Sequence, residues 1–112
     1  MFDAGDIIWI EFGAPFGHEQ SGRRPALVVS PRAYNERSSL IVVCPITRNV
    51  APWVFKVEID SPGRITGAVL VDQVRSIDFA ARHARHAETV SAATLDRVFG
   101  MFAAMFGIPV AR

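Results

Sequence analysis

The chain has 112 residues, of which 50% are hydrophobic and 21% are charged. This composition is that of a globular protein and excludes disordered and fibrous classes. The length allows a real core but is short for two domains of ordinary size, so we expect one domain spanning residues 1–112. The net charge of +1 gives no argument by itself for a polyanionic partner.

The N-terminal sequence MFDAGDIIWIEF is acidic and lacks the basic region of a secretory signal. The longest uncharged stretch, residues 98–111, is shorter than the ~20 residues that a membrane span needs. We therefore expect a cytoplasmic protein with no membrane partner. The single cysteine, Cys44, lies within the apolar run LIVVCPIT, which predicts a buried, reduced thiol.

Short apolar runs separated by turn residues dominate the first two thirds of the chain. Residues 6–12, 24–30 and 39–46 are rich in Ile, Val and Leu and are predicted strands. In residues 53–60 the apolar Trp53, Phe55, Val57 and Ile59 alternate with a mostly polar set, which predicts a half-buried strand. A turn-rich segment follows, and residues 67–75 are the fifth predicted strand.

After Val90 the apolar spacing becomes helical, with Ser91 as the N-cap and Gly107 and Pro109 as the stop signal. Met101, Ala104 and Met105 widen the apolar surface, which indicates a partner surface as well as a core. Antiparallel strands followed by one helix predict a mainly β fold with a C-terminal helix. The architecture would be a small, partly open barrel of SH3 or OB type, or two packed sheets.

Positive charge is concentrated in residues 21–48, which contain five Arg against one Glu. Arginine holds phosphates through its planar fork, and a local patch steers a polyanion more than the total charge does. The alternative is an ordinary solvated surface, because the whole chain has eleven Arg and one Lys.

Polar residues gather at the ends of three apolar runs, in GHEQSGRRPALVVS, CPITRN and VDQVRSID. His83 and His86 lie three residues apart and His18 is remote, with no cysteine pair or carboxylate at ligand spacing, so we expect no metal site and no cofactor. Acids, a histidine and arginines without a metal suit RNA cleavage by the RNA's own 2′-hydroxyl, which needs a base, positive charge and a proton donor. DNA, which lacks this hydroxyl, would be spared.

The motifs GDIIWIEF, GHEQSGRRPALVVSP, YN, VVCPIT and GAVLVDQVRSIDFAAR, in this order, resemble the MazF/PemK (Kid) family of toxin endoribonucleases. The resemblance covers residues 5–82, and the family's closing helix follows. It implies an SH3-like barrel with a C-terminal helix, a homodimer, and ribosome-independent cleavage of single-stranded RNA at short sequences. It also implies inhibition by a cognate MazE/PemI-like antitoxin.

Arg24 matches the essential arginine of the family, and Thr47 matches its partner threonine. Because the pKa of a guanidinium is too high for a good proton donor, we expect Arg24 chiefly to stabilise charge on the phosphorane, although a role as acid is also proposed for the family. Thr47 would donate to a phosphoryl oxygen. The alternatives are a surface ion pair for Arg24 and a strand-end turn for Thr47.

Glu19 matches the loop glutamate of the family and is a candidate base. His18 and Asp72 match residues implicated in the PemK (Kid) branch, where the histidine would exchange protons near neutral pH. Asp72 would orient it, act as the base, or instead anchor the strand through backbone amides. Leu70 stands where that branch has an arginine, as in MazF proteins, so the prediction depends mainly on Arg24 and Thr47.

Phe16 and Trp53 are candidates for base stacking, although a tryptophan in an alternating strand usually belongs to the core. Two other functions remain open: a gyrase poison of the CcdB type, which lacks the EQxGxRP loop seen here, and a non-catalytic RNA-binding barrel. The latter would keep the arginine-rich face without needing Arg24 or Thr47. The remaining residues expected on or around the RNA-binding surface are Arg23, Arg48, Gln73, Arg75, Ser76 and Arg82.

Overall fold

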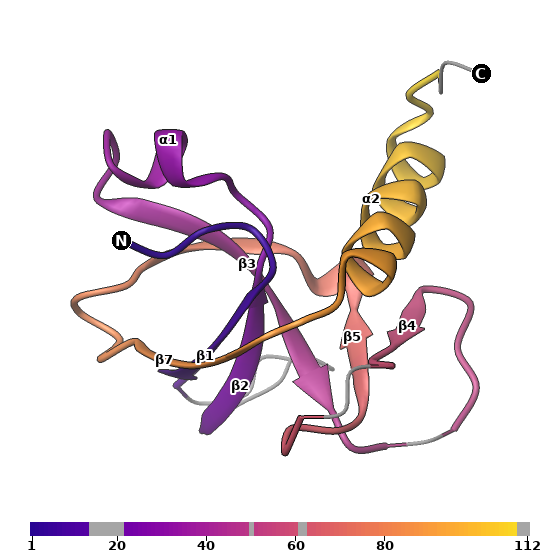
Figure 1. The fold of residues 1–112 in the computed structure, drawn as a ribbon, viewed down its shortest axis with the longest axis horizontal. Coiled ribbons are helices and arrows are strands. Elements are labelled where there is room, and N and C mark those ends of the chain that lie inside the picture. The colour runs from indigo at the N-terminus through magenta and orange to yellow at the C-terminus, as the bar shows by residue number, and fades with distance from the viewer. Residues whose placement is uncertain (14–21, 50, 61–62, 110–112) are drawn as a thin grey trace.

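The computed structural model describes residues 1–13, 22–49, 51–60 and 63–109. Within them the chain is mainly β with one long C-terminal helix, as the sequence predicts (Figure 1). The elements are β1 (Asp6–Glu11), β2 (Arg23–Val28), α1 (Arg32–Asn35), β3 (Leu40–Thr47), β4 (Lys56–Glu58), β5 (Ala68–Leu70), the 3-10 helix η1 (Val71–Gln73), β6 (Arg75–Asp78), β7 (Arg85–Thr89) and α2 (Ala92–Phe106).

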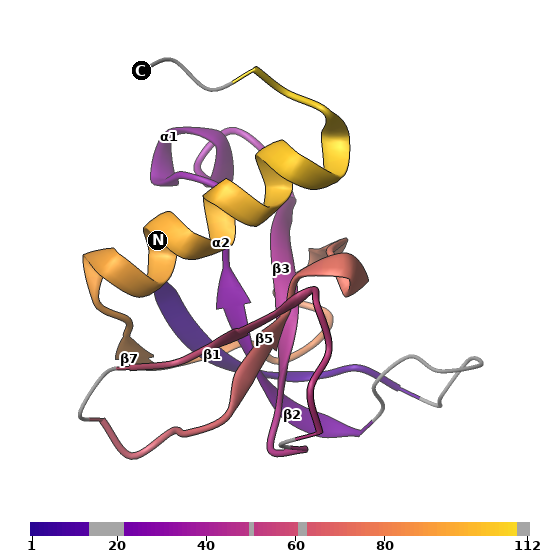
Figure 2. The ribbon, with the colours of Figure 1, turned by 90° about the vertical axis from the view of Figure 1, so that its right-hand side faces the viewer.

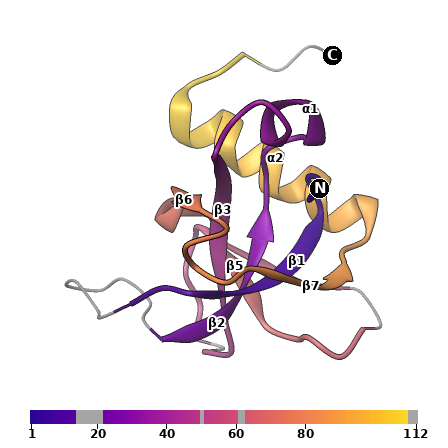
Figure 3. The ribbon, with the colours of Figure 1, turned by 90° about the vertical axis from the view of Figure 1, so that its left-hand side faces the viewer.

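The strands form one antiparallel sheet in the order β4-β5-β3-β2-β1-β7, and β6 pairs with the first half of β3. No ladder joins β4 to β7 in the described part of the chain, so the barrel stays open. Figure 3 shows β6 folded beside β3, apart from the strand β7 that follows it. The central strand β3 therefore contacts three neighbours, β2, β5 and β6.

Strands β1, β2 and β3 lie within two residues of their predicted bounds because both of their faces are buried. One face packs against α2 and forms the helix-side core, which includes Ile7, Leu27 and Val98. The opposite face forms a second core, which includes Ile10 and Val28. A strand buried on both sides has a continuous apolar sequence, which is the pattern of these three runs.

The predicted strand over residues 53–60 is wrong in extent, because only Lys56–Glu58 pairs with β5. Residues before it form a turn in which the Lys56 amide donates to the Trp53 carbonyl (3.1 Å). Trp53 is 51% exposed and does not belong to the core. Side-chain alternation over the turn resembled a strand, but its Phe55 carbonyl accepts from the amide of Val71 in η1 (3.0 Å) instead of continuing the β4–β5 ladder.

The predicted strand over residues 67–75 is interrupted by η1, which takes three residues out of the ladder. Before η1, Val69 pairs with Ile46; after it, Arg75 pairs with Val43. One segment of chain thus pairs with both ends of β3. Its apolar residues Val69, Leu70 and Val71 are all buried, so burial alone could not reveal the break.

Three further elements were not predicted: α1, β7, and β6 beyond its first residue, Arg75. Strand β7 has the sequence RHAET, without an apolar alternation, and its pairing with β1 holds it in the sheet. The short helix α1 ends in Asn35, which is fully buried. Its side-chain amide donates to the carbonyls of Phe2 (2.9 Å) and Ser30 (3.0 Å) and so ties α1 to the N-terminal segment.

Helix α2 begins and ends where the sequence predicts. Ser91 Oγ accepts from the Thr94 amide (3.1 Å), and Gly107 closes the helix in the left-handed conformation at φ +64°. Figure 2 shows α2 lying across the strands. None of the helices in the described ranges combines the length and the apolar character needed to cross a bilayer.

The apolar surface of α2 is wider than its core stripe, as expected, but its large exposed side chains are not the two expected methionines. Met101 and Met105 are half-buried and pack against the helix-side core. Phe99 and Phe106, seven residues apart and therefore on one helix face, are 41% and 63% exposed, and Ile108 beyond the helix is 56% exposed. Of the three residues expected to form this surface, Ala104 is exposed, whereas Met101 and Met105 are half-buried against the core.

Candidate active site

Arg24 and Thr47 lie on neighbouring strands, at the end of the sheet where β2 begins and β3 ends. Ala26 pairs with Pro45, and continuing this register by two residues places Arg24 opposite Thr47. Directly opposite residues of an antiparallel pair point to the same face. Since Ala26 belongs to the second core, Arg24 and Thr47 extend that face beyond the core to its rim.

Thr47 is 7% exposed, and its hydroxyl oxygen accepts from the amide of Asn49 (3.1 Å). A hydroxyl has one proton to donate and two lone pairs, so accepting from Asn49 still allows Thr47 to donate to a ligand. Arg24 is exposed. The pair therefore combines an accessible, permanent positive charge with a hydroxyl in a fixed position.

Arg75 reaches the same end of the sheet from β6. Its guanidinium carbon lies 5.7 Å from the centre of the Phe12 ring, and this cation–π contact holds the half-buried side chain over the second core. Phe12 lies beside the start of β2, because its amide donates to the Gly22 carbonyl (2.8 Å). The contact with Phe12 thus directs the Arg75 guanidinium toward the end of the sheet where β2 begins.

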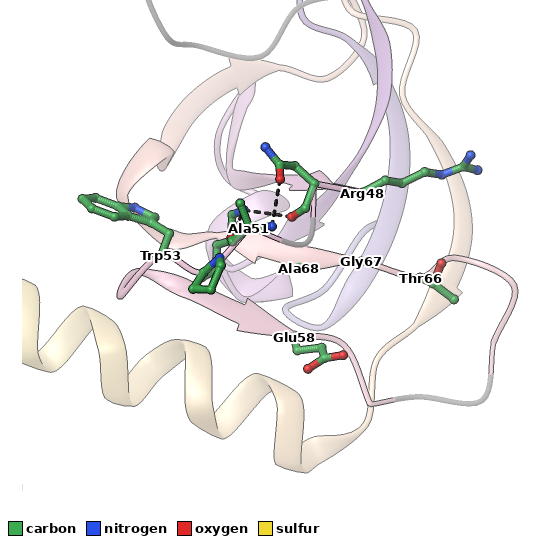
Figure 4. A pocket seen from close by; sticks show the side chains of 10 residues that line it. Arg48, Ala51, Trp53, Glu58, Thr66, Gly67 and Ala68 are labelled. Atoms are coloured by element: carbon green, nitrogen blue, oxygen red, sulfur yellow. Dashed lines mark hydrogen bonds between the residues drawn. The ribbon is translucent and has the colours of Figure 1, made fainter.

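A pocket of about 620 Å³ adjoins Thr47 on the β5 side. Figure 4 shows Trp53 and Arg48 on opposite sides of the pocket, and Glu58 on a third side. The loop between β3 and β4 forms one wall, and Gly67 and Ala68 form another. An aromatic ring and a guanidinium flanking one cavity are suited to a nucleotide, because one stacks on a base and the other binds a phosphate.

Asp72 lies in η1, is exposed, and accepts a hydrogen bond from the indole nitrogen of Trp53 (3.1 Å). This bond ties the β3–β4 loop to η1. Asp72 also contributes to the environment of Cys44: burial, and secondarily the charge of Asp72, raise the pKa of that thiol to about 12. Cys44 is fully buried, as the sequence predicts, and its thiol is not a nucleophile.

The other predicted RNA-binding residues occupy different places. Arg23 and Ser76 are exposed on β2 and β6, and Arg48 is exposed at the pocket. Gln73 is half-buried in η1. Arg82 donates to the Glu11 carbonyl (2.8 Å), so its guanidinium holds the segment between β6 and β7 against β1.

Three predicted residues, Phe16, His18 and Glu19, lie outside the described residues. In the flanking strands, the Phe12 amide donates to the Gly22 carbonyl, and Glu11 pairs with Arg23.

Sequence reasoning missed Lys56, and it included Asn49 only as the last residue of the polar stretch CPITRN, with no role of its own. The ammonium of Lys56 donates to the carbonyls of Asn49 (2.8 Å) and Ala51 (2.7 Å), and the Asn49 amide reaches Thr47. The one available signal was that Lys56 is the only lysine in a chain with eleven arginines. Within the alternating pattern of residues 53–60, Lys56 was interpreted as an ordinary residue on the solvent-exposed face of a strand.

Comparison with known proteins relates the sequence and fold of this chain to RNA-cleaving toxins. A family model described as PemK-like, MazF-like toxin of type II toxin-antitoxin system matches residues 3–106. The endoribonuclease toxin MazF of Escherichia coli K12 is 39% identical over 89 residues, covering 80% of this chain and 79% of that protein. The endoribonuclease PemK of Escherichia coli is 39% identical over 102 residues, covering 88% of this chain and 77% of that protein.

Solved structures agree with the sequence comparison. MazF from Deinococcus radiodurans superposes with a TM-score of 0.88 at 39% identity, covering 95% of this chain and 96% of that one. A MazE–MazF structure from the same organism gives a TM-score of 0.83 at 34% identity, covering 96% of both chains. The open antiparallel sheet with its C-terminal helix is thus the fold of these proteins.

Proposed function

The chain belongs to the PemK-like, MazF-like toxins of type II toxin-antitoxin systems, and we propose that it cleaves single-stranded RNA by attack of a ribose 2′-hydroxyl on the adjacent phosphorus. RNA cleavage is the function of this family, and the chain is an endoribonuclease. The proposal concerns the chemistry, the residues that perform it and the partners.

The reaction forms a bond between the 2′-oxygen and phosphorus and breaks the bond between phosphorus and the 5′-oxygen. A base takes the 2′-hydroxyl proton, and an acid gives a proton to the leaving 5′-oxygen. The products are a 2′,3′-cyclic phosphate and a 5′-hydroxyl. Neither a metal nor a cofactor enters this balance, and the substrate itself supplies the nucleophile.

Arg24 stabilises the negative charge that develops on the phosphorane, and Thr47 donates a hydrogen bond to one of its oxygens. The register that brings these two side chains to the same face of the sheet is the observation that carries the proposal. Asp72, His18 and Glu19 are the candidate proton carriers. Asp72 already accepts from Trp53, which leaves its second carboxylate oxygen for this role.

The RNA would extend over the exposed cations around this pair. Arg23 and Arg48 are exposed, and Arg75 is half-buried at the same end of the sheet. Trp53 is available for stacking, since it is 51% exposed and its ring contacts Phe55 edge-on (centroids 5.5 Å apart). Gln73, Ser76 and Arg82 belong to the strands and turns that support this surface.

A cognate MazE/PemI-like antitoxin is the proposed protein partner, in the cytoplasm. The MazE–MazF structures to which the chain is similar support it. An acidic, hydrophobic antitoxin tail would meet the same arginines as RNA does, so RNA and antitoxin should compete. The exposed Phe99, Phe106 and Ile108 support a homodimer, because apolar surface of this kind is unfavourable in water.

End-group analysis of cleaved RNA tests the mechanism directly. The purified protein is incubated with a long RNA in excess EDTA, and the ends are mapped. We expect undiminished cleavage, with cyclic phosphate and 5′-hydroxyl ends, and no cleavage when the nucleotide before the scissile phosphate is 2′-deoxy. Products with a 5′-phosphate, or loss of all activity in EDTA, would refute the proposed attack by the 2′-hydroxyl.

A further inference from the structure

The side chain of Lys56 binds the main chain of two residues that follow Thr47. The Lys56 ammonium donates to the main-chain carbonyls of Asn49 (2.8 Å) and Ala51 (2.7 Å). Two carbonyls converging on one ammonium form charge-assisted hydrogen bonds, which are stronger than bonds between neutral groups. Lys56 itself is fixed, because it begins β4 and pairs with Leu70 of β5.

Asn49 and Ala51 also determine how the Thr47 hydroxyl is oriented. The main-chain amide of Asn49 donates to Thr47 Oγ1 (3.1 Å). The side-chain oxygen of Asn49, Oδ1, accepts from the main-chain amide of Ala51 (2.9 Å). With one lone pair occupied by Asn49, the hydroxyl proton of Thr47 has fewer directions available. The position of the Asn49 main-chain N–H therefore limits the directions in which the Thr47 hydroxyl can donate.

These contacts form a continuous path from a charged side chain to a proposed catalytic hydroxyl. Lys56 binds the carbonyl of Asn49, and the amide of the same residue binds Thr47. Without the ammonium, the two carbonyls would lose their hydrogen-bond partner, and the main chain at Asn49 and Ala51 would no longer be anchored to β4. A compact ammonium with rotatable donors suits two main-chain carbonyls two residues apart better than the planar fork of arginine does.

We propose that Lys56 is a positioning residue for RNA cleavage, which acts by holding the main chain at Asn49 and Ala51 so that Thr47 presents its hydroxyl to the phosphorane. This inference rests on the proposed role of Thr47. It predicts an effect on the chemical step rather than on RNA binding, although Lys56 is a cation that lines the pocket.

The test uses Lys56→Met, which keeps most of the aliphatic stem and removes the ammonium, and Lys56→Arg, which restores a charge. Single-turnover cleavage of an oligonucleotide with one cleavage site gives the rate, and binding of its uncleavable 2′-deoxy analogue gives the affinity. We expect Lys56→Met to lower the rate about 10- to 100-fold, the effect of a small misplacement of a reacting group, with affinity changed less than threefold. Lys56→Arg should recover part of the rate.

A double mutant separates positioning through Thr47 from an independent effect. In a Thr47→Val background, Lys56→Met should lower the rate no further, because the hydroxyl it positions is gone. An equal loss in both backgrounds, a loss of affinity alone, or a wild-type rate for Lys56→Met would overturn the proposal. If Thr47→Val alone cleaves at the wild-type rate, the proposed role of Thr47 fails, and the role of Lys56 fails with it.

Two controls keep folding and net charge out of the result. Arg85→Met removes one exposed positive charge from β7, at the other edge of the sheet, and should cleave at the wild-type rate. Hydrogen exchange of the main-chain amide of Asn49 reports on the hydrogen bond to Thr47 without any activity measurement. The exchange should accelerate in Lys56→Met, while the amides of β1 keep their protection. If Lys56→Met fails to fold, Lys56→Gln is measured in the same assays, and unchanged exchange at Asn49 in a folded variant refutes the inference.

Discussion

Gly67 lies so close to Thr47 that a β-carbon at position 67 would be 2.2 Å from the Thr47 carbonyl oxygen. The contact is between backbones: Gly67 precedes β5, and Ala68 pairs with Thr47. Gly67 also has φ +124°, which side chains rarely permit. The end of β3 that carries Thr47 is therefore fixed in place by a residue with no side chain.

Gly67→Ala should destabilise the fold by at least about 2 kcal/mol, from backbone strain and from the clash with a carbonyl that cannot move without disturbing the β3–β5 ladder. Urea denaturation gives the free energy of unfolding. Gly100→Ala is the matched control: Gly100 lies within α2 with open space around it, so alanine should stabilise by roughly 0.5–1 kcal/mol. Equal effects at the two positions would contradict this account of Gly67.

Arg24→Ala should lower the rate of RNA cleavage on the order of 100-fold or more, the typical effect of removing one donor from a charge-stabilising site. Stability should change little, because the side chain is exposed. Arg24→Lys should restore the rate only in part, because an ammonium lacks the fork that binds two phosphate oxygens. The assay is single-turnover cleavage with urea denaturation alongside, and near wild-type turnover by Arg24→Ala would show that the charge comes from elsewhere.

Cys44 should be unreactive in the folded protein. Burial and the charge of Asp72 raise the pKa of its thiol to about 12, and only the thiolate reacts with a disulfide reagent. At pH 8 a chromogenic disulfide should therefore label the protein only as fast as it unfolds, and at once in concentrated urea. Asp72→Asn should leave this protection in place, because burial is the larger cause; rapid labelling of the native protein would contradict the burial of Cys44.

Acid should weaken the junction between β4 and α2 through Asp60. Hydrogen bonds from Ser91 and Thr94, and then the interactions with Arg97, lower the pKa of this carboxyl to about 2. A carboxyl whose pKa is lower in the folded than in the unfolded state stabilises the fold above the unfolded value, here 3.8, and this contribution is lost as pH falls toward 2. Asp60→Asn should therefore flatten the fall in unfolding free energy between pH 4 and pH 2, measured by urea titrations.

The outcome for Asp60→Asn is compared with Asp96→Asn, an exposed carboxyl of the same helix region. The Asp96 variant should keep the acid dependence of the parent protein. If both variants lose it equally, the dependence arises from overall charge rather than from the hydrogen bonds of Asp60.

The sequence by itself determined the elements whose periodicity follows from their burial. Strands β1, β2 and β3 are apolar because both faces are covered, and α2 repeats with helical spacing between Ser91 and Gly107. The motifs around Arg24 and Thr47 also identified the family before any geometry was known. These features are local, since a short window of residues contains the whole signal.

Only the tertiary structure decided how segments distant in sequence pair. The break at η1 exists because one segment pairs with both ends of β3, and β7 exists because β1 offers it an edge. Trp53 lies in a turn before β4, and its indole donates to Asp72, a contact between segments that the local pattern does not reveal. The same holds for the site: the register between β2 and β3 brings Arg24 to Thr47, and Lys56 reaches the Thr47 loop only because β4 folds back beside it. Hydrogen bonds across such separations leave no period in the sequence, since each depends on where another segment has already packed.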